Sequence, residues 1–437
     1  MRISFKTFGC RLNQAETARF ERDFLAAGWQ VVPYPAAADA VVIHGCAVTR
    51  IAERECLRLA RGMKRRATRM EQPEPYVVLV GCVVEADATR LRVAGVDLLV
   101  PRQDKERLAE IVAARLESMA SLQDDRGRIC LTDPTCLTDS ACRYARALLK
   151  VQDGCDFRCA YCIVPHTRGA PVSRPWQVVL DEAWALARAG FQELVIAGCN
   201  VACYRDNRRG LAELLAAIAA LDEVRRVRLS SIEPATCERE VIDLMATCHK
   251  LCRYLHLPLQ SGDAGVLAAM RRRYTPEQYT ATVRHAVARI PDLGLGSDVI
   301  VGFPGESAEA FANTLRLIAD LPFSNLHVFP FSERPGTPAA TFGHGVPMPV
   351  RKARATVLIR LRGEKRQVFA ATFVGRPVEV LIERRSKDGC GHGWSGQYLD
   401  CRVAGVERAD IGRVLSFQPT AAMEGGLIGR SLSDSAV

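Results

Sequence analysis

The stretch that decides how this chain folds and works is Asp153-Gly154-Cys155-Asp156-Phe157-Arg158-Cys159-Ala160-Tyr161-Cys162. Its three cysteines are separated by three and then by two residues, and a β-rich segment ends just before it. Three thiolates on one short loop can converge on a single metal centre. A structural zinc site takes four ligands, and a [4Fe–4S] cube normally takes four thiolates. We expect an iron–sulfur cube with one iron left open to a small molecule; the alternatives are zinc or buried thiols.

The sequence around this loop alternates between strand and helix patterns. Strands are expected at residues 148–152, 193–197, 226–231, 253–258, 296–301 and 325–331. Helices are expected at residues 177–189, 211–220, 239–247, 264–272, 276–289 and 308–319. Such units over residues 141–370 predict a partial or full β/α barrel, in which chemistry lies at the C-terminal ends of strands.

The segment before the loop has a shorter alternation of the same kind. Strands are expected at residues 3–8, 40–44, 76–80 and 96–100, and helices at 13–27, 49–69 and 105–117. This pattern predicts a small parallel α/β domain over residues 1–118. Residues 119–140 are polar and rich in turn residues, so we interpret them as a linker.

The last part of the chain, residues 371–437, has a different pattern. Short strands are expected at residues 378–383, 398–403 and 413–417. Turns rich in glycine are expected between them, at Gly389, Gly391, Gly393 and Gly396. The prediction is a small all-β module, a five-stranded barrel of the OB type. The fold class is therefore α/β with a third, all-β module.

Composition excludes several classes of protein. The chain has 437 residues, 48% of them hydrophobic and 25% charged, which is the balance of a soluble globular protein. No window approaches 18 apolar residues and the first residues do not resemble a signal peptide, so we expect a cytoplasmic protein without a membrane partner. Seventeen cysteines in such a chain favour metal binding or chemistry over disulfides. The net charge of +10 is weak support for an anionic partner.

A second cysteine set lies in the N-terminal domain. The dipeptides Gly9-Cys10, Gly45-Cys46 and Gly81-Cys82 are spaced 36 residues apart, and each follows an expected strand. Cysteines at corresponding ends of parallel strands gather at one sheet edge, where α/β sheets bind ligands. A glycine before each cysteine lets the backbone approach a bulky cluster. We predict a second three-thiolate iron–sulfur site; the alternative is three buried turn cysteines.

At the three-cysteine loop the sequence resembles the radical S-adenosylmethionine (SAM) superfamily. With the second cysteine set, the segment Phe8-Gly-Cys-Arg-Leu-Asn-Gln-Ala-Glu-Thr17 and the terminal β module, it resembles the methylthiotransferases over nearly its whole length. The terminal module resembles a TRAM domain, which binds RNA. Residues 8–17, 228–234 and 329–339 are most similar to the MtaB-type branch.

The resemblance implies SAM and two [4Fe–4S] clusters as cofactors. Cys155, Cys159 and Cys162 hold the radical SAM cluster, and Cys10, Cys46 and Cys82 hold an auxiliary cluster. SAM contacts are expected from the segments at the strand ends, at Tyr161, Gly198, Asn200, Ser231, Glu233, Gln260 and Asp298. No residue is assigned to acid–base catalysis, because the chemistry is carried by the clusters and SAM.

The resemblance also implies an activity. The MtaB-type branch adds a methylthio group to C2 of N6-threonylcarbamoyladenosine at position 37 of tRNA. The alternatives are a methylthiotransferase acting on isopentenyladenosine in tRNA or on an aspartate of a ribosomal protein, and a metal-bearing RNA-binding protein that is not an enzyme. The implied partners are tRNA, SAM and an electron donor such as flavodoxin or ferredoxin.

Two basic runs are candidates for contacts with RNA phosphates. The first follows Cys46 at helical spacing, and the second joins the barrel to the β module. The residues assigned are Arg54, Arg58, Arg61, Arg65, Arg354 and Lys365. The alternative for each run is an ordinary solvated helix face.

Some residues depart from the family pattern. His44-Gly45 replaces the usual Asn-Thr before the second cysteine, and Val83-Val84-Glu85 replaces a run that ends in Gln. His44 is therefore an alternative extra cluster ligand. Cys199 and Cys203 occupy positions where other residue types are usual, and we interpret both as buried or incidental thiols.

Overall fold

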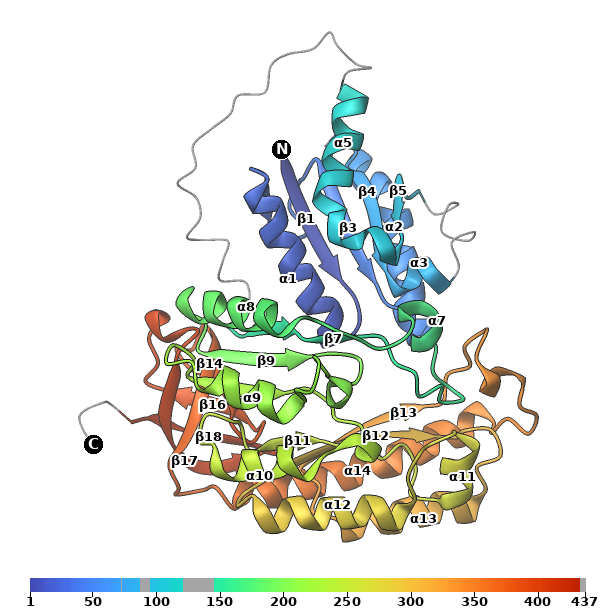
Figure 1. The fold of residues 1–437 in the computed structure, drawn as a ribbon, viewed down its shortest axis with the longest axis vertical. Helices are drawn as coiled ribbons and strands as arrows, with labels where there is room; N and C mark the ends of the chain where they lie inside the picture. Colours follow the sequence, from blue (N-terminus) through green and yellow to red (C-terminus); the bar gives the residue numbers. More distant parts are fainter. Residues whose placement is uncertain (72, 87–94, 121–144, 433–437) are drawn as a thin grey trace. The chain divides into compact units, whose positions relative to one another are not determined.

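The computed structural model describes residues 1–71, 73–86, 95–120 and 145–432 (Figure 1). The predicted linker therefore lies almost entirely outside the described residues. Two compact units divide the chain: residues 1–143 with 162–170, and residues 144–161 with 171–437. No helix in the described part of the chain is both long enough and apolar enough to cross a membrane.

The N-terminal unit contains a five-stranded parallel sheet, which confirms the predicted small α/β fold. Its strands are β1 (Arg2–Thr7), β2 (Gln30–Val32), β3 (Ala40–Gly45), β4 (Tyr76–Gly81) and β5 (Leu98–Val100), in the order β2-β1-β3-β4-β5. The helical segments are α1 (Arg11–Ala26), α2 (Arg50–Arg69), α3 (Cys82–Ala86), η1 (Arg102–Arg107), α5 (Leu108–Ala120) and, from the inserted segment, α7 (Val164–Arg168). The short elements β2 and α3 were not predicted, because three to five residues carry no periodic signal.

Local chemistry explains why α2 begins and packs where it does. The Thr49 side chain accepts a hydrogen bond from the backbone N–H of Ala52 at 3.2 Å and so caps the helix. One face of α2 buries Leu57, Ala60 and Met63 against β3 and β4, whose valine and isoleucine runs are buried on both faces. The opposite face keeps the arginines exposed.

The larger unit contains six parallel strands in two three-stranded sheets. They are β6 (Ala147–Lys150), β9 (Glu193–Ala197), β10 (Arg226–Leu229), β11 (Tyr254–His256), β12 (Gly294–Val301) and β13 (Asn325–Pro330). The backbone N–H of Cys252 donates to the Val227 carbonyl at 2.8 Å, which joins the two sheets next to β10 and β11. Among the described strands no ladder joins β13 to β6, so the barrel is partial.

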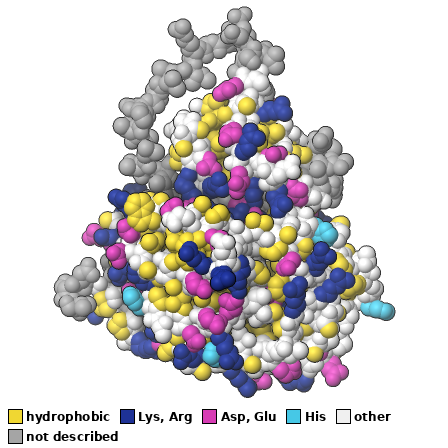
Figure 2. Space-filling view, viewed as in Figure 1, with side chains coloured by type: hydrophobic (Ala, Val, Ile, Leu, Met, Phe, Trp, Pro, Cys, Tyr) yellow, Lys and Arg dark blue, Asp and Glu magenta, His cyan; other side chains and the backbone are white. Residues whose placement is uncertain are grey.

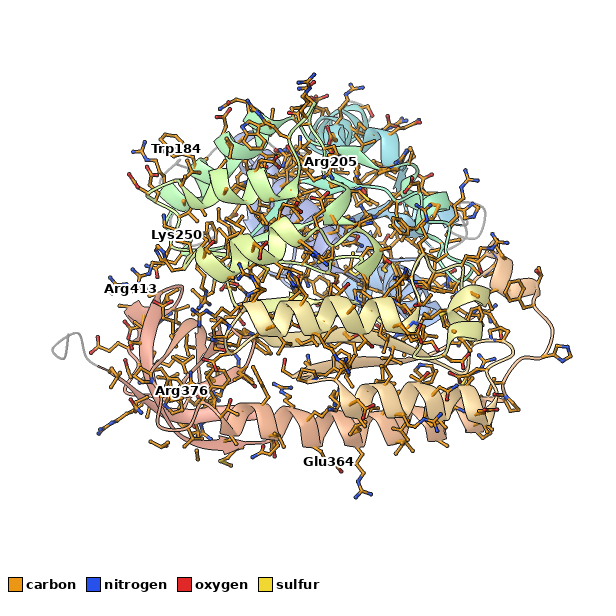
Figure 3. All side chains as sticks on the ribbon, turned by 60° about the horizontal axis from the view of Figure 1, so that its bottom comes forward. Trp184, Arg205, Lys250, Glu364, Arg376 and Arg413 are labelled. Atoms are coloured by element: carbon orange, nitrogen blue, oxygen red, sulfur yellow. The ribbon has the colours of Figure 1, made fainter. Side chains whose placement is uncertain are left out.

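Helices cover one face of these strands. They are α8 (Trp176–Arg188), α9 (Leu211–Ala219), α10 (Arg239–Thr247), α11 (Ala264–Ala269), α12 (Pro276–Arg289), α13 (Ala308–Asp320) and α14 (Met348–Ala371). The 24-residue helix α14 was not predicted; in sequence it is visible only as a basic run. Ala355 and Leu358 anchor it to the core, and Glu364 projects from it in Figure 3.

The C-terminal strands form a closed five-stranded barrel, as predicted. They are β14 (Val378–Arg385), β15 (Gly391–Ser395), β16 (Asp400–Ala404), β17 (Val414–Met423) and β18 (Gly426–Ser431), in the order β14-β15-β16-β18-β17. The prediction of turns at Gly391 and Gly393 was wrong, because both lie within β15. A Cβ at Gly393 would lie 1.8 Å from the Leu381 carbonyl oxygen, so this glycine allows a close strand approach.

Buried charges and aromatic rings join this barrel to the strands of the same unit. Arg228 and Arg226 pair with the fully buried Glu193 and donate to the carbonyls of Ser395 and Trp394, at 2.8 and 3.1 Å. The Tyr398 ring stacks between those of Trp394 and Tyr254, with centroids 4.5 and 4.8 Å away. The β-barrel is therefore fixed to the core rather than loosely linked.

Candidate cluster and cofactor sites

The structure brings the three N-terminal cysteines together at one sheet edge. Cys10 follows β1 and occupies the N-cap position of α1 without a side-chain capping hydrogen bond. Cys46 follows β3, and Cys82 follows β4 as the first residue of α3. Burial raises the pKa of the Cys46 thiol to about 11, and the charges of Cys10 and Cys82 add to this effect. Cys10 Sγ lies 3.7 Å from Asn13 Oδ1, and Arg168 donates to that oxygen at 2.7 Å and to Cys82 Sγ at 3.1 Å, so these two thiols share neighbours.

The surroundings of these thiols fit a bulky cluster. Gly9 has φ +106°, and a Cβ there would lie 2.6 Å from the Cys46 Cβ. Thiols with raised pKa values are poor thiolates on their own, but a bound metal deprotonates them. Three converging sulfur donors, with a backbone cleared by glycine, suit a [4Fe–4S] cluster with three protein ligands.

The two departures from the family pattern have structural partners in this unit. His44 Nδ1 lies 2.9 Å from the Thr17 hydroxyl, and Nε2 lies 3.5 Å from a Glu16 carboxylate oxygen. Nδ1 is therefore engaged by Thr17, whereas Nε2 is buried without a hydrogen bond to any described residue, and a role of His44 as an extra ligand stays a prediction. Glu85 accepts a hydrogen bond from the Arg102 backbone N–H at 2.7 Å, at the start of η1.

The three-cysteine loop begins after β7 (Gln152–Asp153), which pairs with β8 (Val172–Ser173). Cys155 is half-buried and Cys159 is buried. Burial raises the pKa of Cys155 to about 11, and the charges of Cys159 and Cys203 add to it. Cys162 is half-buried and is the first residue of the segment 162–170, which belongs to the N-terminal unit. Its short spacing in the sequence relates it to Cys155 and Cys159.

A buried arginine that the sequence analysis missed lies beside Cys159. Arg272 donates from Nη1 to Cys159 Sγ and to the Tyr161 hydroxyl, each at 3.3 Å. Its Nη2 donates to both carboxylate oxygens of Glu233. Burial raises the pKa of Glu233, and the positive charge of Arg272 opposes this rise. Two predicted site residues, Tyr161 and Glu233, are therefore brought together with a thiol by one guanidinium.

Residues 198–203, which follow β9, contact residues at the start of the three-cysteine loop. Gln152 Oε1 accepts a hydrogen bond from the Asn200 backbone N–H at 3.0 Å and lies 3.0 Å from where a Cβ on Gly198 would be. Asn200 Nδ2 contacts Cys203 Sγ at 3.0 Å, and Cys199 Sγ contacts Asp153 at 3.6 Å. Cys199 and Cys203 are half-buried neighbours of the loop. Ser231, after β10, is exposed, and within the described residues no hydrogen bond links it to this group.

A second polar group lies on β11, β12 and β13. His256 Nε2 and His327 Nδ1 each lie 3.1 Å from Asp298 Oδ1. Burial raises the pKa of Asp298, but the two imidazoles outweigh burial and the pKa is lowered. The Gln260 backbone N–H donates to the Asp298 carbonyl at 2.8 Å, which adds another predicted residue. His327, which sequence analysis missed, has 46% of its side chain exposed.

This polar group lies on the strand face that is not packed against helices. On β12, the Ser297 hydroxyl accepts a hydrogen bond from the Tyr279 hydroxyl of α12. Val299 and Val301 of the same strand belong to the hydrophobic core. Because side chains alternate along a strand, Asp298 points to the opposite face. We call that face the inner face of the barrel.

The basic runs differ in what their side chains do. Arg54, Arg58, Arg61 and Arg65 are exposed on α2, and we call them the α2 stripe. Arg354 instead pairs with the buried carboxylate of Glu306, and Lys365 donates to the carbonyls of Ala319 and Leu321 at the end of α13. Both side chains therefore have partners within the protein, and phosphate contacts from them stay a prediction.

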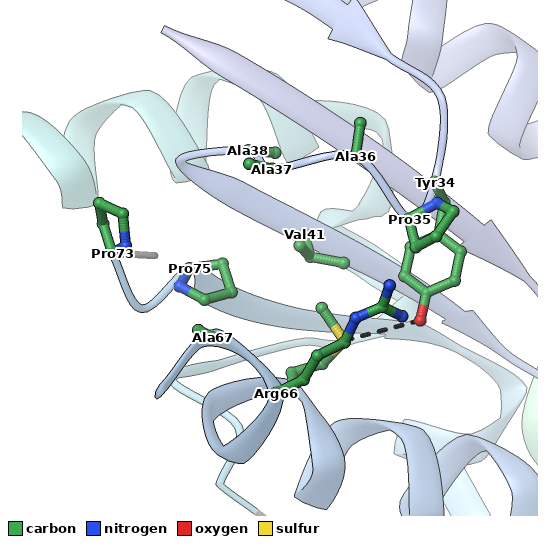
Figure 4. Close-up of a pocket in the computed structure, with 11 residues that line it drawn as sticks. Tyr34, Pro35, Ala36, Ala37, Ala38, Val41, Arg66, Ala67, Pro73 and Pro75 are labelled. Atoms are coloured by element: carbon green, nitrogen blue, oxygen red, sulfur yellow. Dashed lines mark hydrogen bonds between the residues drawn. The ribbon is translucent and has the colours of Figure 1, made fainter. Parts of the chain in front are cut away.

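Surface charge alone does not locate an RNA site. On the face shown in Figure 2, lysine and arginine side chains are spread over the surface with acidic side chains among them. A small cavity in the N-terminal unit, lined by Tyr34, Met63 and Arg66 among others, has a volume of about 30 Å³ (Figure 4). That volume holds about one water molecule and is too small for a cofactor.

Comparison with known proteins identifies the family. The Radical SAM superfamily matches residues 149–318, and the Uncharacterized protein family UPF0004 matches residues 2–100. The chain is 33% identical to the threonylcarbamoyladenosine tRNA methylthiotransferase MtaB of Bacillus subtilis, over 94% of this chain and 92% of that one. It is also 33% identical to a tRNA-2-methylthio-N(6)-dimethylallyladenosine synthase of Erythrobacter litoralis, over 87% and 86%.

Solved structures give the same fold. The radical SAM methyltransferase TsrM of Kitasatospora setae, with cobalamin and a [4Fe–4S] cluster bound, is 16% identical with a TM-score of 0.57, covering 78% of this chain and 77% of that one. At this identity the likeness concerns the fold alone. The relatives over nearly the full length decide the family: this chain belongs to the radical SAM methylthiotransferases, enzymes that use SAM and [4Fe–4S] clusters.

Proposed function

We propose that this chain adds a methylthio group to C2 of N6-threonylcarbamoyladenosine at position 37 of tRNA. The observation that carries the proposal is the presence of two three-cysteine sets in one chain of this family. No side chain can remove a proton from an unactivated C–H bond at neutral pH, so a radical route is needed. When bound, the loop cluster and SAM supply that radical.

The cysteines and their neighbours have distinct proposed roles. Cys155, Cys159 and Cys162 hold the radical SAM cluster, and Cys10, Cys46 and Cys82 hold the auxiliary one. The proposed SAM contacts remain Tyr161, Gly198, Asn200, Ser231, Glu233, Gln260 and Asp298. Arg272 adds to this proposal, because its two hydrogen bonds to Glu233 fix that carboxylate beside Cys159.

The inner face of the barrel favours threonylcarbamoyladenosine over its prenylated counterpart. The threonylcarbamoyl group carries a carboxylate and a hydroxyl, whereas the isopentenyl group is apolar. His256, Asp298 and His327 lie together there, and the partly exposed His327 can form hydrogen bonds with a ligand. Covering these polar groups with a prenyl chain would leave hydrogen bonds unmade, at a cost of about 1–3 kcal/mol each.

The RNA is proposed to contact two parts of the chain. The α2 stripe would bind phosphates, which position RNA without reading its sequence. Residues 371–437 would act as a TRAM-like RNA-binding module. The other proposed domains are a cluster domain at residues 1–118 and a radical SAM core at residues 141–370. The base must leave its stack to react. A flavodoxin or ferredoxin is the proposed electron donor, and the cytoplasm the proposed location.

Mass analysis of digested tRNA from a strain that lacks this gene tests the substrate. The expected result is loss of 2-methylthio-N6-threonylcarbamoyladenosine, with recovery when the gene is restored. Persistence of that nucleoside, in a strain without a second such enzyme, would overturn the proposal. Loss of the methylthio isopentenyl nucleoside instead would assign the other tRNA substrate, and loss of methylthio-aspartate from a ribosomal protein would assign the protein substrate.

Anaerobic reconstitution separates the enzyme from a metal-bearing RNA-binding protein. Two [4Fe–4S] clusters correspond to about eight irons per chain. We expect this iron content together with SAM cleavage. Zinc without SAM turnover would contradict the proposed cysteine roles.

A further inference from the structure

Arg168 makes an unusual contact within the N-terminal unit. It ends α7 and is 4% exposed, and its Nε donates to Cys82 Sγ at 3.1 Å. Its Nη2 donates to Asn13 Oδ1 at 2.7 Å and to Glu16 Oε2 at 3.1 Å. The guanidinium is planar and rigid, so these partners fix its orientation toward the sulfur.

The three thiols at this sheet edge differ in their hydrogen-bond partners. Cys46 Sγ accepts a backbone N–H from Val48 at 3.4 Å, and Cys10 Sγ lies 3.7 Å from Asn13 Oδ1. Neither of these contacts brings a charged donor. Cys82 therefore has a charge-assisted hydrogen bond, which is stronger than a neutral one.

Arg168 shares its carboxylate partner with a second buried cation. Glu16 is buried and pairs with both Arg168 and Lys105, which is itself buried. His44 Nε2 lies 3.5 Å from the same carboxylate. Two buried cations thus share the carboxylate of Glu16. The cation that touches the sulfur is Arg168.

The hydrogen bond and the positive charge of Arg168 would act in the same direction on a cluster bound at these cysteines. Reduction adds a negative charge, and reduction potentials of iron–sulfur clusters depend on net charge, burial and hydrogen bonds to the sulfurs. A guanidinium that donates to a ligand sulfur stabilises the more negative, reduced form. Groups beyond the ligands also orient them and tune the metal.

We infer that Arg168 is a positioning residue for the N-terminal cluster: it holds the Cys82 thiolate in place and raises the reduction potential of that cluster. This inference rests on the proposed role of Cys10, Cys46 and Cys82. It assigns a function in the N-terminal unit to a residue that follows the three-cysteine loop in sequence.

An EPR-monitored redox titration of the reconstituted full-length protein tests the inference. Each variant is also made together with Cys159→Ala, which removes the overlapping signal of the loop cluster. We expect Arg168→Met to lower the potential of the N-terminal cluster and to change its EPR spectrum. We expect Glu16→Gln, which removes the anion, to raise the potential. Arg354→Met removes a similarly buried ion pair remote in sequence from the cysteines and should leave the potential unchanged.

An unchanged potential in Arg168→Met, with the cluster retained, would overturn the inference and leave Arg168 as a structural ion pair. If Arg168→Met fails to retain the cluster, Glu16→Gln decides: a higher potential supports the inference and an unchanged one refutes it. The iron content of the parent protein tests the proposed function separately. About four irons per chain, held by the loop alone, would remove the N-terminal cluster and this inference with it.

Discussion

The buried ion pairs of Glu193 offer a quantitative test of how the β-barrel is held on the core. Glu193 begins β9 and is fully buried, and its carboxylate pairs with Arg226 and Arg228. The same guanidiniums donate to the Trp394 and Ser395 carbonyls of the β-barrel. Glu193→Gln keeps the shape of the side chain but leaves two guanidiniums buried without their anion.

The magnitude follows from the pKa of this carboxyl. Burial alone would raise it, but Arg228 and Arg226 outweigh burial and lower it from 4.5 to about 2. A pKa that falls by this much on folding stabilises the folded state by about 3 kcal/mol at neutral pH. The pKa is depressed, so the contribution is complete above pH 4.5 and is lost as pH falls toward about 2. The site is fully buried, which leaves little screening by solvent.

Urea unfolding of the full-length apoprotein, followed by tryptophan fluorescence, measures the loss. We expect Glu193→Gln to lower the free energy of unfolding of the larger unit by about 3 kcal/mol at pH 7 and equally at pH 5.5. Hydrogen exchange should rise in peptides from β10 and β15. The control is Glu379→Gln, whose pair with Arg225 is 58–59% exposed. An exposed pair of this kind contributes under about 1 kcal/mol.

Equal losses in the two variants would refute the reasoning, because the buried pair would then contribute no more than the exposed one. A difference that shrinks between pH 7 and pH 5.5 would also contradict it. Stability is lost as the pH falls only where the unfolded state binds more protons, so that result would require an unfolded-state pKa well above the ordinary value of 4.5.

Three further predictions concern the cysteines and the RNA. Cys159→Ala should abolish SAM cleavage and lower the iron content from about eight to about four per chain; cleavage at the parent rate would contradict the role of the loop. Gly9→Ala should weaken iron retention in the N-terminal site, because its φ of +106° strains any side chain and its Cβ would collide with Cys46; parent-like iron content would contradict this. Arg61→Ala should reduce the salt dependence of tRNA binding by about one ion, whereas Arg360→Ala on α14 should leave it unchanged; equal slopes in filter-binding assays would exclude the α2 stripe.

Elements with strong local signals could be predicted from sequence, and others could not. Helix α12 was predicted with its observed bounds, because Thr275 caps it and Pro276 begins it. Helix α14 was missed, because its charged residues spread around the helix and only a few positions, such as Ala355 and Leu358, anchor it. The glycines of β15 were read as turn residues, although Gly393 is required by a close contact between strands that no local pattern records.

The candidate site shows the same division. The cysteines follow expected strands at short or regular spacing, so the sequence indicates which of them gather. Arg272 and His327 carry no such signal, since they meet Cys159 and Asp298 only when distant strands are assembled. The reverse holds for Lys365, whose charge suggested a phosphate contact but whose amine is bound by the end of α13.

The missed arginines reveal a feature that the two cysteine sets share. Arg272 donates to Cys159 and to Glu233, just as Arg168 donates to Cys82 and to Glu16. In each case a buried guanidinium offsets the charge of a thiolate, and a carboxylate on its other side holds its orientation. The two groups differ in their additional partners: Lys105 is a second cation that pairs with Glu16, whereas the Tyr161 hydroxyl accepts a hydrogen bond from Arg272. At each proposed cluster site, the positive charge of the arginine would therefore stabilise the reduced form.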